Sequence, residues 1–201
     1  MKQLTTLALI SIAYFIVVVV ILHFLRPDVD PLHRPTSEYA VGRYGFLMTT
    51  AFLSMSVASL SLLVGLYRGI SSAAQSRIGL FLLGVWGAGV LVAMSFHIDP
   101  EGTEQTLSGI IHRINGPLIF LSLTIGVLLI SKSFSRDANW RTAYRYARPI
   151  SLIMFAIFLV TVVNVATGSG FEGLCQRVFL LTFVAWFILT ALRLRLANRN
   201  K

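Results

Sequence analysis

Residues 5–25 read TTLALISIAYFIVVVVILHFL, and this apolar run decides the fold. An α-helix rises about 1.5 Å per residue, so about 20 apolar residues cross the roughly 30 Å hydrocarbon core of a bilayer. The run is longer than the core of a typical signal peptide, and no Ala-x-Ala-like cleavage site follows it. The polar segment Arg26-Pro27-Asp28 ends it instead. We therefore expect a retained membrane anchor.

Five further runs of comparable length and hydropathy follow the first. Together they predict six membrane-spanning helices, at about residues 5–25, 44–67, 78–96, 110–131, 149–168 and 178–194. Hydrophobic residues make up 56% of the chain and charged residues only 12%, well below the charged share of an ordinary soluble domain. The sequence therefore predicts an all-α membrane protein with a single six-helix domain over residues 1–201. It argues against a soluble enzyme and against a disordered chain.

The positive charges lie mainly on one side of this arrangement. That side holds both termini and carries 12 Lys and Arg residues against one acid, Asp137, whereas the other side carries 5 basic and 7 acidic residues. Because cytoplasmic segments of membrane proteins are enriched in Lys and Arg, we expect both termini in the cytoplasm and the chain in the inner, cytoplasmic membrane. The basic residues would then face anionic lipid headgroups.

One basic segment has a pattern of its own. Arg141, Arg145 and Arg148 recur at helical spacing among Trp and Tyr residues, as in a short amphipathic helix that lies in the membrane interface. No recognisable nucleic-acid fold surrounds this segment, so nucleic acid is not an expected partner. The expected partners are the lipid bilayer and other membrane proteins.

Small residues in the third run indicate how the helices pack. Gly84 and Ala88 are four residues apart, as are Gly89 and Ala93, and such spacing lets helix backbones approach closely in a membrane. Serines recur along the second run, and their hydroxyls can bond either to their own helix or to a neighbouring one. We expect both features to serve packing.

Most other polar residues lie on the side opposite the basic one. All four histidines belong to it, namely His23, His33, His97 and His112. A carboxylate, Asp99, follows His97 by two residues, and His112 lies across a short loop, so this group could bind a metal or orient a general base. We take Asp99, His112 and His97 as candidate catalytic residues, with the metal or other cofactor undecided. The candidate ligand-binding residues are Glu38, Arg43, Asn115, Asn164 and Glu172.

Pro117 leaves the local structure around His112 open. A proline inside a helix removes one backbone hydrogen bond and bends the axis. Either the fourth helix is kinked just beyond His112, or the regular helix begins near Pro117 and His112 belongs to the preceding loop.

Three short motifs carry a family resemblance over nearly the whole chain. They are Ser37-Glu38-Tyr39 before the second run, Phe96-His97-Ile98-Asp99 after the third, and Gly109-Ile110-Ile111-His112 at the start of the fourth. In these features the chain resembles a family of bacterial and archaeal six-span membrane proteins catalogued as a domain of unknown function. That family more often has Pro and Thr in place of His97 and Ile98. The resemblance therefore singles out Asp99 and His112.

Two functional hypotheses follow. In the first, the chain is a binding, sensing or accessory membrane protein, and Asp99, His112, Glu38 and Arg43 form a charge-paired network that fixes loops and helix ends. In the second, it is a lipid-modifying or metal-assisted hydrolytic enzyme at the outer leaflet that uses Asp99 and His112. A haem carrier and a transporter fit less well, because the histidines lie at helix ends and the middle of the membrane holds almost no ionisable group.

Overall fold

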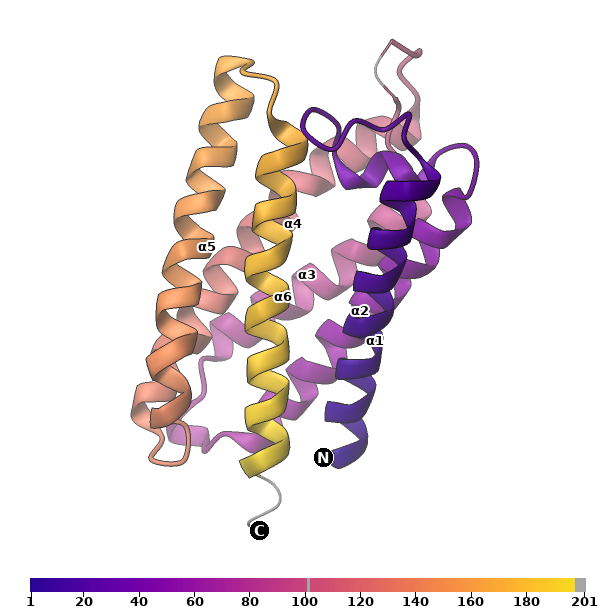
Figure 1. Cartoon of the computed structure of the whole chain (residues 1–201). Coiled ribbons are helices and arrows are strands. Elements are labelled where there is room, and N and C mark those ends of the chain that lie inside the picture. Colours follow the sequence, from indigo (N-terminus) through magenta and orange to yellow (C-terminus); the bar gives the residue numbers. More distant parts are fainter. Residues whose placement is uncertain (101, 198–201) are drawn as a thin grey trace.

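The structure, a computed structural model, describes residues 1–100 and 102–197, and these form helices without strands (Figure 1). Six long helices follow one another: α1 (Lys2–Leu25), α2 (Gly45–Gly69), α3 (Arg77–Ser95), α4 (Leu107–Ser133), α5 (Arg141–Thr167) and α6 (Glu172–Ala197). Three short 3-10 helices lie between them: η1 (Thr36–Ala40), η2 (Ser72–Ala74) and η3 (Phe134–Arg136). Glu101, Arg199 and Lys201, which the charge count includes, lie outside the described residues.

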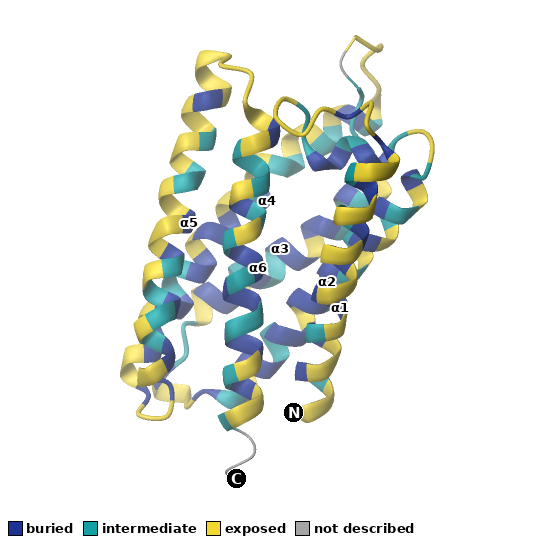
Figure 2. Cartoon of the chain, in the orientation of Figure 1, coloured by how far each residue is buried: buried dark blue, intermediate teal, exposed yellow. Residues whose placement is uncertain are grey.

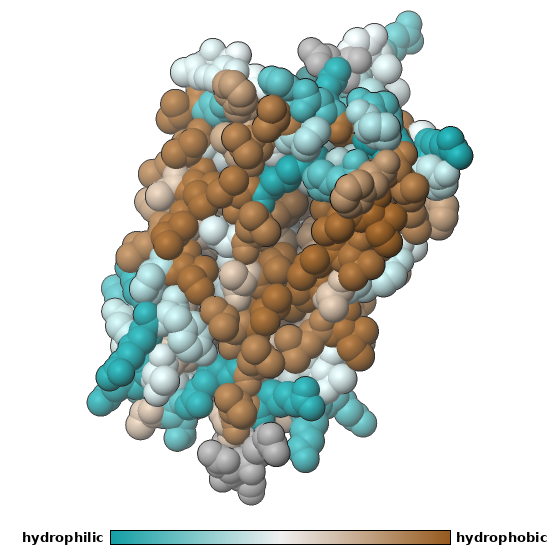
Figure 3. Space-filling model, in the orientation of Figure 1, coloured by the Kyte–Doolittle hydropathy of each residue, from teal (hydrophilic) through white to brown (hydrophobic). Residues whose placement is uncertain are grey.

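The six helices pack into one antiparallel bundle, and most of their buried residues face its interior (Figure 2). Consecutive helices contact each other, and α6 closes the bundle against α1 and α2. The start of α1 and the end of α6 lie at one end of the bundle, which we call the terminal end (Figure 1). The opposite end, which we call the η1 end, carries the loops 26–44, 96–106 and 168–171. Each long helix is long and apolar enough to cross a membrane. On the face that Figure 3 shows, a broad apolar band lies between two polar ends.

The expectation of six apolar helices is therefore confirmed, but two helices begin earlier than hydropathy indicates. α5 begins at Arg141 rather than near Pro149, and α6 begins at Glu172 rather than near Val178. Hydropathy marks only the part of a helix that meets hydrocarbon, whereas polar residues continue the helix beyond it. The expectation of a separate interfacial helix around Arg145 is accordingly wrong, because this segment forms the first turns of α5.

α4 resolves the question that Pro117 raised. The helix runs without a break from Leu107 to Ser133, and Pro117 lies inside it. Thr106 caps its start, since the Thr106 hydroxyl accepts a hydrogen bond of 3.1 Å from the backbone N–H of Gly109. His112 consequently lies in the helix, in its second turn, and the alternative that placed it in the preceding loop is wrong.

Close contacts of α3 hold the middle of the bundle together. On one face, the hydroxyl of Ser56 in α2 donates to the backbone carbonyl of Gly87 at 2.8 Å. On the other face, a Cβ placed on Gly89 would collide with the Cγ2 methyl of Ile119 in α4. Ala88, in contrast, is exposed. The small residues therefore do serve packing, but Ala88 does not belong to the seam.

The two neighbouring positions offer a matched test of this packing. We expect Gly89→Ala to destabilise the protein, because the new methyl forces Ile119 away from α3, at a cost of about 1–3 kcal/mol that exceeds the gain in helix propensity of about 1 kcal/mol. Ala88→Val adds bulk one residue away on an exposed face and should change stability by less than about 0.5 kcal/mol. Thermal unfolding in detergent compares the two. Equal melting temperatures would contradict the assigned contact.

Candidate functional site

Asp99 fixes the loop between α3 and α4. Its carboxylate accepts hydrogen bonds from the backbone N–H of Thr106 at 2.8 Å and from the Thr106 hydroxyl at 2.7 Å. These bonds hold the pKa of the Asp99 carboxyl below its usual value, the hydroxyl contributing most. A Cβ on Gly109 would collide with this carboxylate. Asp99 and Gly109, from two separate motifs of the sequence, thus pack directly against each other.

His112 bonds to a different group. Its Nδ1 lies 2.8 Å from the backbone carbonyl of Phe96. A carbonyl oxygen only accepts, so Nδ1 carries the proton and Nε2 of the neutral ring is left as an acceptor. No bond joins His112 to Asp99 within the described part of the chain. Asp99 and His112 are close in the sequence, but the structure does not join them as a hydrogen-bonded carboxylate and imidazole.

His97 lies beside both residues without bridging them. The backbone carbonyl of His97 accepts from the Ser108 hydroxyl at 2.9 Å, and the ring Nε2 lies 3.4 Å from the hydroxyl of Thr49 in α2. Across residues 1–100 and 102–197, no three His, Cys, Asp or Glu side chains are close enough together to hold a metal ion.

The five candidate ligand-binding residues are scattered. Glu38 pairs with Arg34 at 3.5 Å, and the Arg43 guanidinium lies 4.7 Å from the centre of the Tyr44 ring. The other three are on long helices: Asn115 donates to the backbone carbonyl of Gly89 in α3 at 2.9 Å, Asn164 is buried in α5, and Glu172 is exposed at the start of α6. In the charge-paired network expected of Asp99, His112, Glu38 and Arg43, the first two residues instead bond to Thr106 and to the Phe96 carbonyl.

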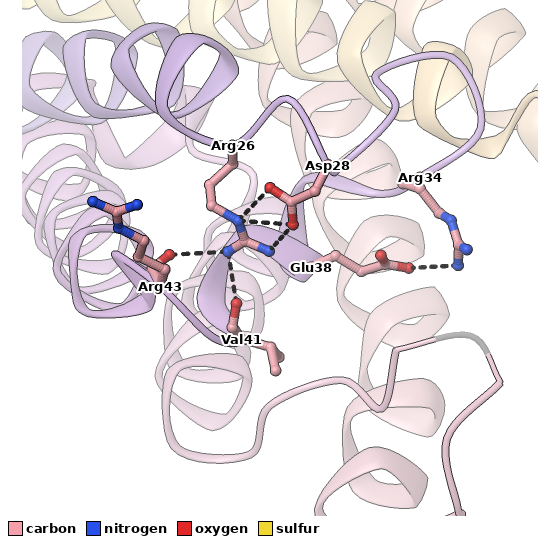
Figure 4. Close-up of polar contacts among 6 residues, drawn as sticks. All are labelled: Arg26, Asp28, Arg34, Glu38, Val41 and Arg43. Carbon is pink, nitrogen blue, oxygen red and sulfur yellow. Dashed lines mark hydrogen bonds and ion pairs between the residues drawn. The ribbon is translucent and has the colours of Figure 1, made fainter.

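Arg26 is a central residue that the sequence analysis missed. It follows α1 directly, and its side chain bonds Asp28 through Nε and Nη2 and the backbone carbonyls of Val41 and Arg43 through Nη1, the last two at 2.7 and 3.1 Å (Figure 4). Its hydrogen bonds with Asp28 raise the pKa of Arg26 and lower that of Asp28. Arg26 therefore ties the end of α1 to the segment that leads into α2.

A second arginine, Arg177 of α6, holds η1 against the bundle. Its Nε donates to Nε2 of His23 at 2.9 Å, and Nη2 donates to the hydroxyl of the fully buried Tyr39 at 3.3 Å. Nη1 donates to the backbone carbonyls of Arg34 and Gly173. All these acceptors are neutral, and no described carboxylate forms an ion pair with Arg177. Sequence spacing gives no sign of this cluster, because its members are up to 154 residues apart.

Beneath η1, a cavity extends into the bundle among α1, α2, α3, α4 and α6. The cavity is partly open. Its volume is about 50 Å³ on the scale used for empty cavities in proteins, and all the unfilled space, open parts included, amounts to about 510 Å³. Its inner wall is apolar and aromatic, with Phe15, Met55, Trp86, Phe120 and Phe183 among the lining residues.

The wall of the cavity is polar where it approaches the η1 end. Thr36, Ser37, His112 and Gln176 supply the polar groups there. Lining residues Gly116 and Phe120 of α4 and Leu180 of α6 are only half-buried. Of all the candidate residues from the sequence, only His112 lines this cavity.

These features define a class: a multi-pass integral membrane protein with an apolar cavity between its helices that is polar at one end. The chain belongs to the family described as Protein of unknown function (DUF998), whose model matches residues 9–193. The resemblance seen in the sequence is thus confirmed at the level of the family. No curated protein and no solved structure matches the chain.

The hydrogen bonds of Asp99 give its contribution to stability a defined pH dependence. Because folding lowers the pKa of this carboxyl, its contribution is complete above the ordinary value of about 4 and is lost as the pH falls through the folded-state value. We expect Asp99→Asn to lower the melting temperature at pH 7. As the pH is lowered from 5 to 2.5, the melting temperature of this variant should decrease less than that of the wild type. Glu104→Gln, which removes an exposed carboxylate of the same loop, is the control and should leave that decrease unchanged.

Proposed function

We propose that the chain binds a molecule with a single apolar chain in the cavity, as a binding or accessory component of the membrane. The cavity itself is the observation that carries the proposal. Its apolar interior and its polar η1 end match an amphipathic occupant, whose chain would lie among the aromatic rings and whose end group would lie near Thr36 and Gln176.

Two further features of the wall support a slender, flexible occupant taken from the membrane. Met48 and Met55 line the cavity, and methionine side chains adapt readily to chains of different shape. The half-buried Gly116 and Leu180 lie about a third of the way along α4 and α6, and the half-buried Phe120 lies about halfway along α4. Both helices are long and apolar enough to cross a membrane. An apolar chain could therefore enter between these helices directly from the hydrocarbon.

The geometry favours binding over hydrolysis. A general base needs an imidazole oriented by its partner toward the reacting group. The ring of His112 is oriented by the carbonyl of Phe96. Both carboxylate oxygens of Asp99 accept hydrogen bonds from Thr106 instead. The lipid-modifying or metal-assisted enzyme remains the second hypothesis from the sequence, and the structure adds no observation in its favour.

The distribution of charge supports a direction in the membrane. Lys and Arg outnumber the acids only on the side of the terminal end, so we place this end in the cytoplasm and the η1 end outside the inner membrane. The end group of the occupant would then lie at the outer leaflet. At the cytoplasmic face, exposed Arg141 and Arg145 would contact anionic headgroups.

The fluorescence of Trp86 tests whether a single-chain lipid binds in the cavity. Trp86 lines the cavity, whereas Trp140 and Trp186 donate hydrogen bonds to Gly69 and Ser131 elsewhere in the bundle. We expect a single-chain lipid brominated near mid-chain to quench part of the emission of the purified protein saturably, because bromine would lie beside the indole ring.

Two variants control this experiment. Trp86→Phe should abolish the saturable part, and it breaks no hydrogen bond because the indole N–H has no partner among the described residues. Ala93→Leu narrows the cavity and should weaken binding at least several-fold, provided that its melting temperature stays near that of the wild type. Quenching that is linear in lipid concentration, or unchanged in Trp86→Phe, would contradict the proposed function.

Labelling with a membrane-impermeant maleimide tests which end of the bundle faces the cytoplasm. In a Cys175→Ser background, Glu104→Cys places an exposed thiol in the loop between α3 and α4, and Ser72→Cys places one in η2. The cells are intact but allow the maleimide to reach the outer face of the inner membrane. We expect Cys at position 104 to react in these cells and Cys at position 72 to react only after lysis. The reverse pattern would show that the η1 end faces the cytoplasm.

A further inference from the structure

The polar end of the cavity has a definite hydrogen-bonding character, and the inference drawn from it rests on the function proposed above. Gln176, in the second turn of α6, lines the cavity. Its Oε1 lies 2.6 Å from the backbone nitrogen of Thr36 and 2.9 Å from the Thr36 hydroxyl. A backbone N–H can only donate, so the atom that faces Thr36 must be the carbonyl oxygen of the side-chain amide. Its NH₂ group therefore points away from Thr36.

This NH₂ group is an unused donor. Within the described residues, Gln176 Nε2 makes no hydrogen bond, and the Ser37 hydroxyl makes none either although Ser37 is only 6% exposed. Both side chains line the cavity. An occupant that supplies acceptor oxygens at this position can therefore accept hydrogen bonds from donors that the chain itself does not use.

The positive charge of Arg177 also favours an acceptor oxygen near Gln176. Arg177 follows Gln176 in the chain, and its guanidinium bonds His23, Tyr39 and two backbone carbonyls. None of these acceptors carries a negative charge. The positive charge of Arg177 is therefore not cancelled by its own contacts, and it favours electron-rich oxygen over a cationic group near Gln176.

From this geometry we infer that the end group bound in the cavity is a fatty acyl group, with its carbonyl or carboxylate oxygen accepting hydrogen bonds from Gln176 Nε2 and the Ser37 hydroxyl. A free fatty acid and an acyl ester share this chemistry. A cationic alkyl ammonium has donors only, so it would face the NH₂ group of Gln176 and the charge of Arg177, and only the Ser37 hydroxyl oxygen and Nε2 of His112 could accept from it.

A matched series of ligands tests the inference through the quenching of Trp86. The three probes carry the same brominated chain and end in a carboxylate, a methyl ester or an ammonium group. We expect the carboxylate and the ester to bind the wild-type protein about tenfold or more tightly than the ammonium does. A carboxylate that binds much more tightly than the ester identifies a free fatty acid as the ligand, and similar affinities identify the ester of an intact lipid.

Gln176→Glu is the decisive variant. The glutamate keeps an oxygen for both bonds from Thr36, while the donor group becomes a second oxygen. We expect the carboxylate and ester probes to bind about tenfold more weakly and the ammonium probe to bind more tightly, so that the order of preference reverses. Ser37→Ala, which leaves the bonds between Thr36 and Gln176 intact, should weaken ester and carboxylate binding about threefold and leave the ammonium unchanged.

The outcomes separate this inference from the function on which it rests. If no probe quenches Trp86 saturably, the proposed function fails and the inference fails with it. If all three probes bind the wild-type protein equally well, or if Gln176→Glu weakens all three by the same factor, the cavity still binds an apolar chain but does not select an acyl group. Should Gln176→Glu fail to fold, the response of Ser37→Ala to the three probes decides in the same way.

Discussion

Hydrocarbon offers no hydrogen bonds, so backbone carbonyls that are buried where the connection between α1 and α2 meets the helices need partners within the chain. Arg26 and Arg177 meet this constraint for the long connection between α1 and α2. Arg26 bonds the carbonyls of Val41 and Arg43, and Arg177 bonds the carbonyl of Arg34 and the hydroxyl of Tyr39. The connection therefore folds back over the helices rather than extending from them, and η1 becomes the polar end of the cavity.

Hydropathy predicted the number and the order of the helices because it reports which residues contact lipid. It could not predict where α5 and α6 begin, since Arg141 and Glu172 continue a helix outside the hydrocarbon through backbone hydrogen bonds alone. The position of His112 was ambiguous for a related reason. Proline disfavours the interior of a helix, but α4 continues through Pro117 because packing against α3 and α5 holds it.

For the candidate site, the sequence indicated residues that are close together but did not reveal their bonding partners. Asp99 and His112 are close in sequence and suited to act together, yet each bonds a group that spacing does not reveal: Thr106 for the carboxylate and the Phe96 carbonyl for the ring. The residues that shape the polar end of the cavity were harder to find. Gln176 and Thr36 are 140 residues apart, and neither belongs to a charged or histidine-rich pattern. Only the fold brings them together.

The cavity also makes physical sense in a bundle that is otherwise closely packed. At about 24 cal/mol per Å³, an empty space of about 50 Å³ costs on the order of 1 kcal/mol, a small fraction of the stability of a folded domain. Close contacts at Gly87 and Gly89 hold α3 against α2 and α4 at mid-membrane, so these helices cannot simply move together to fill the space above. Rigid walls of this kind keep a cavity available to an occupant. The bonds from Arg177 to η1 then hold the polar groups of η1 in place at its end.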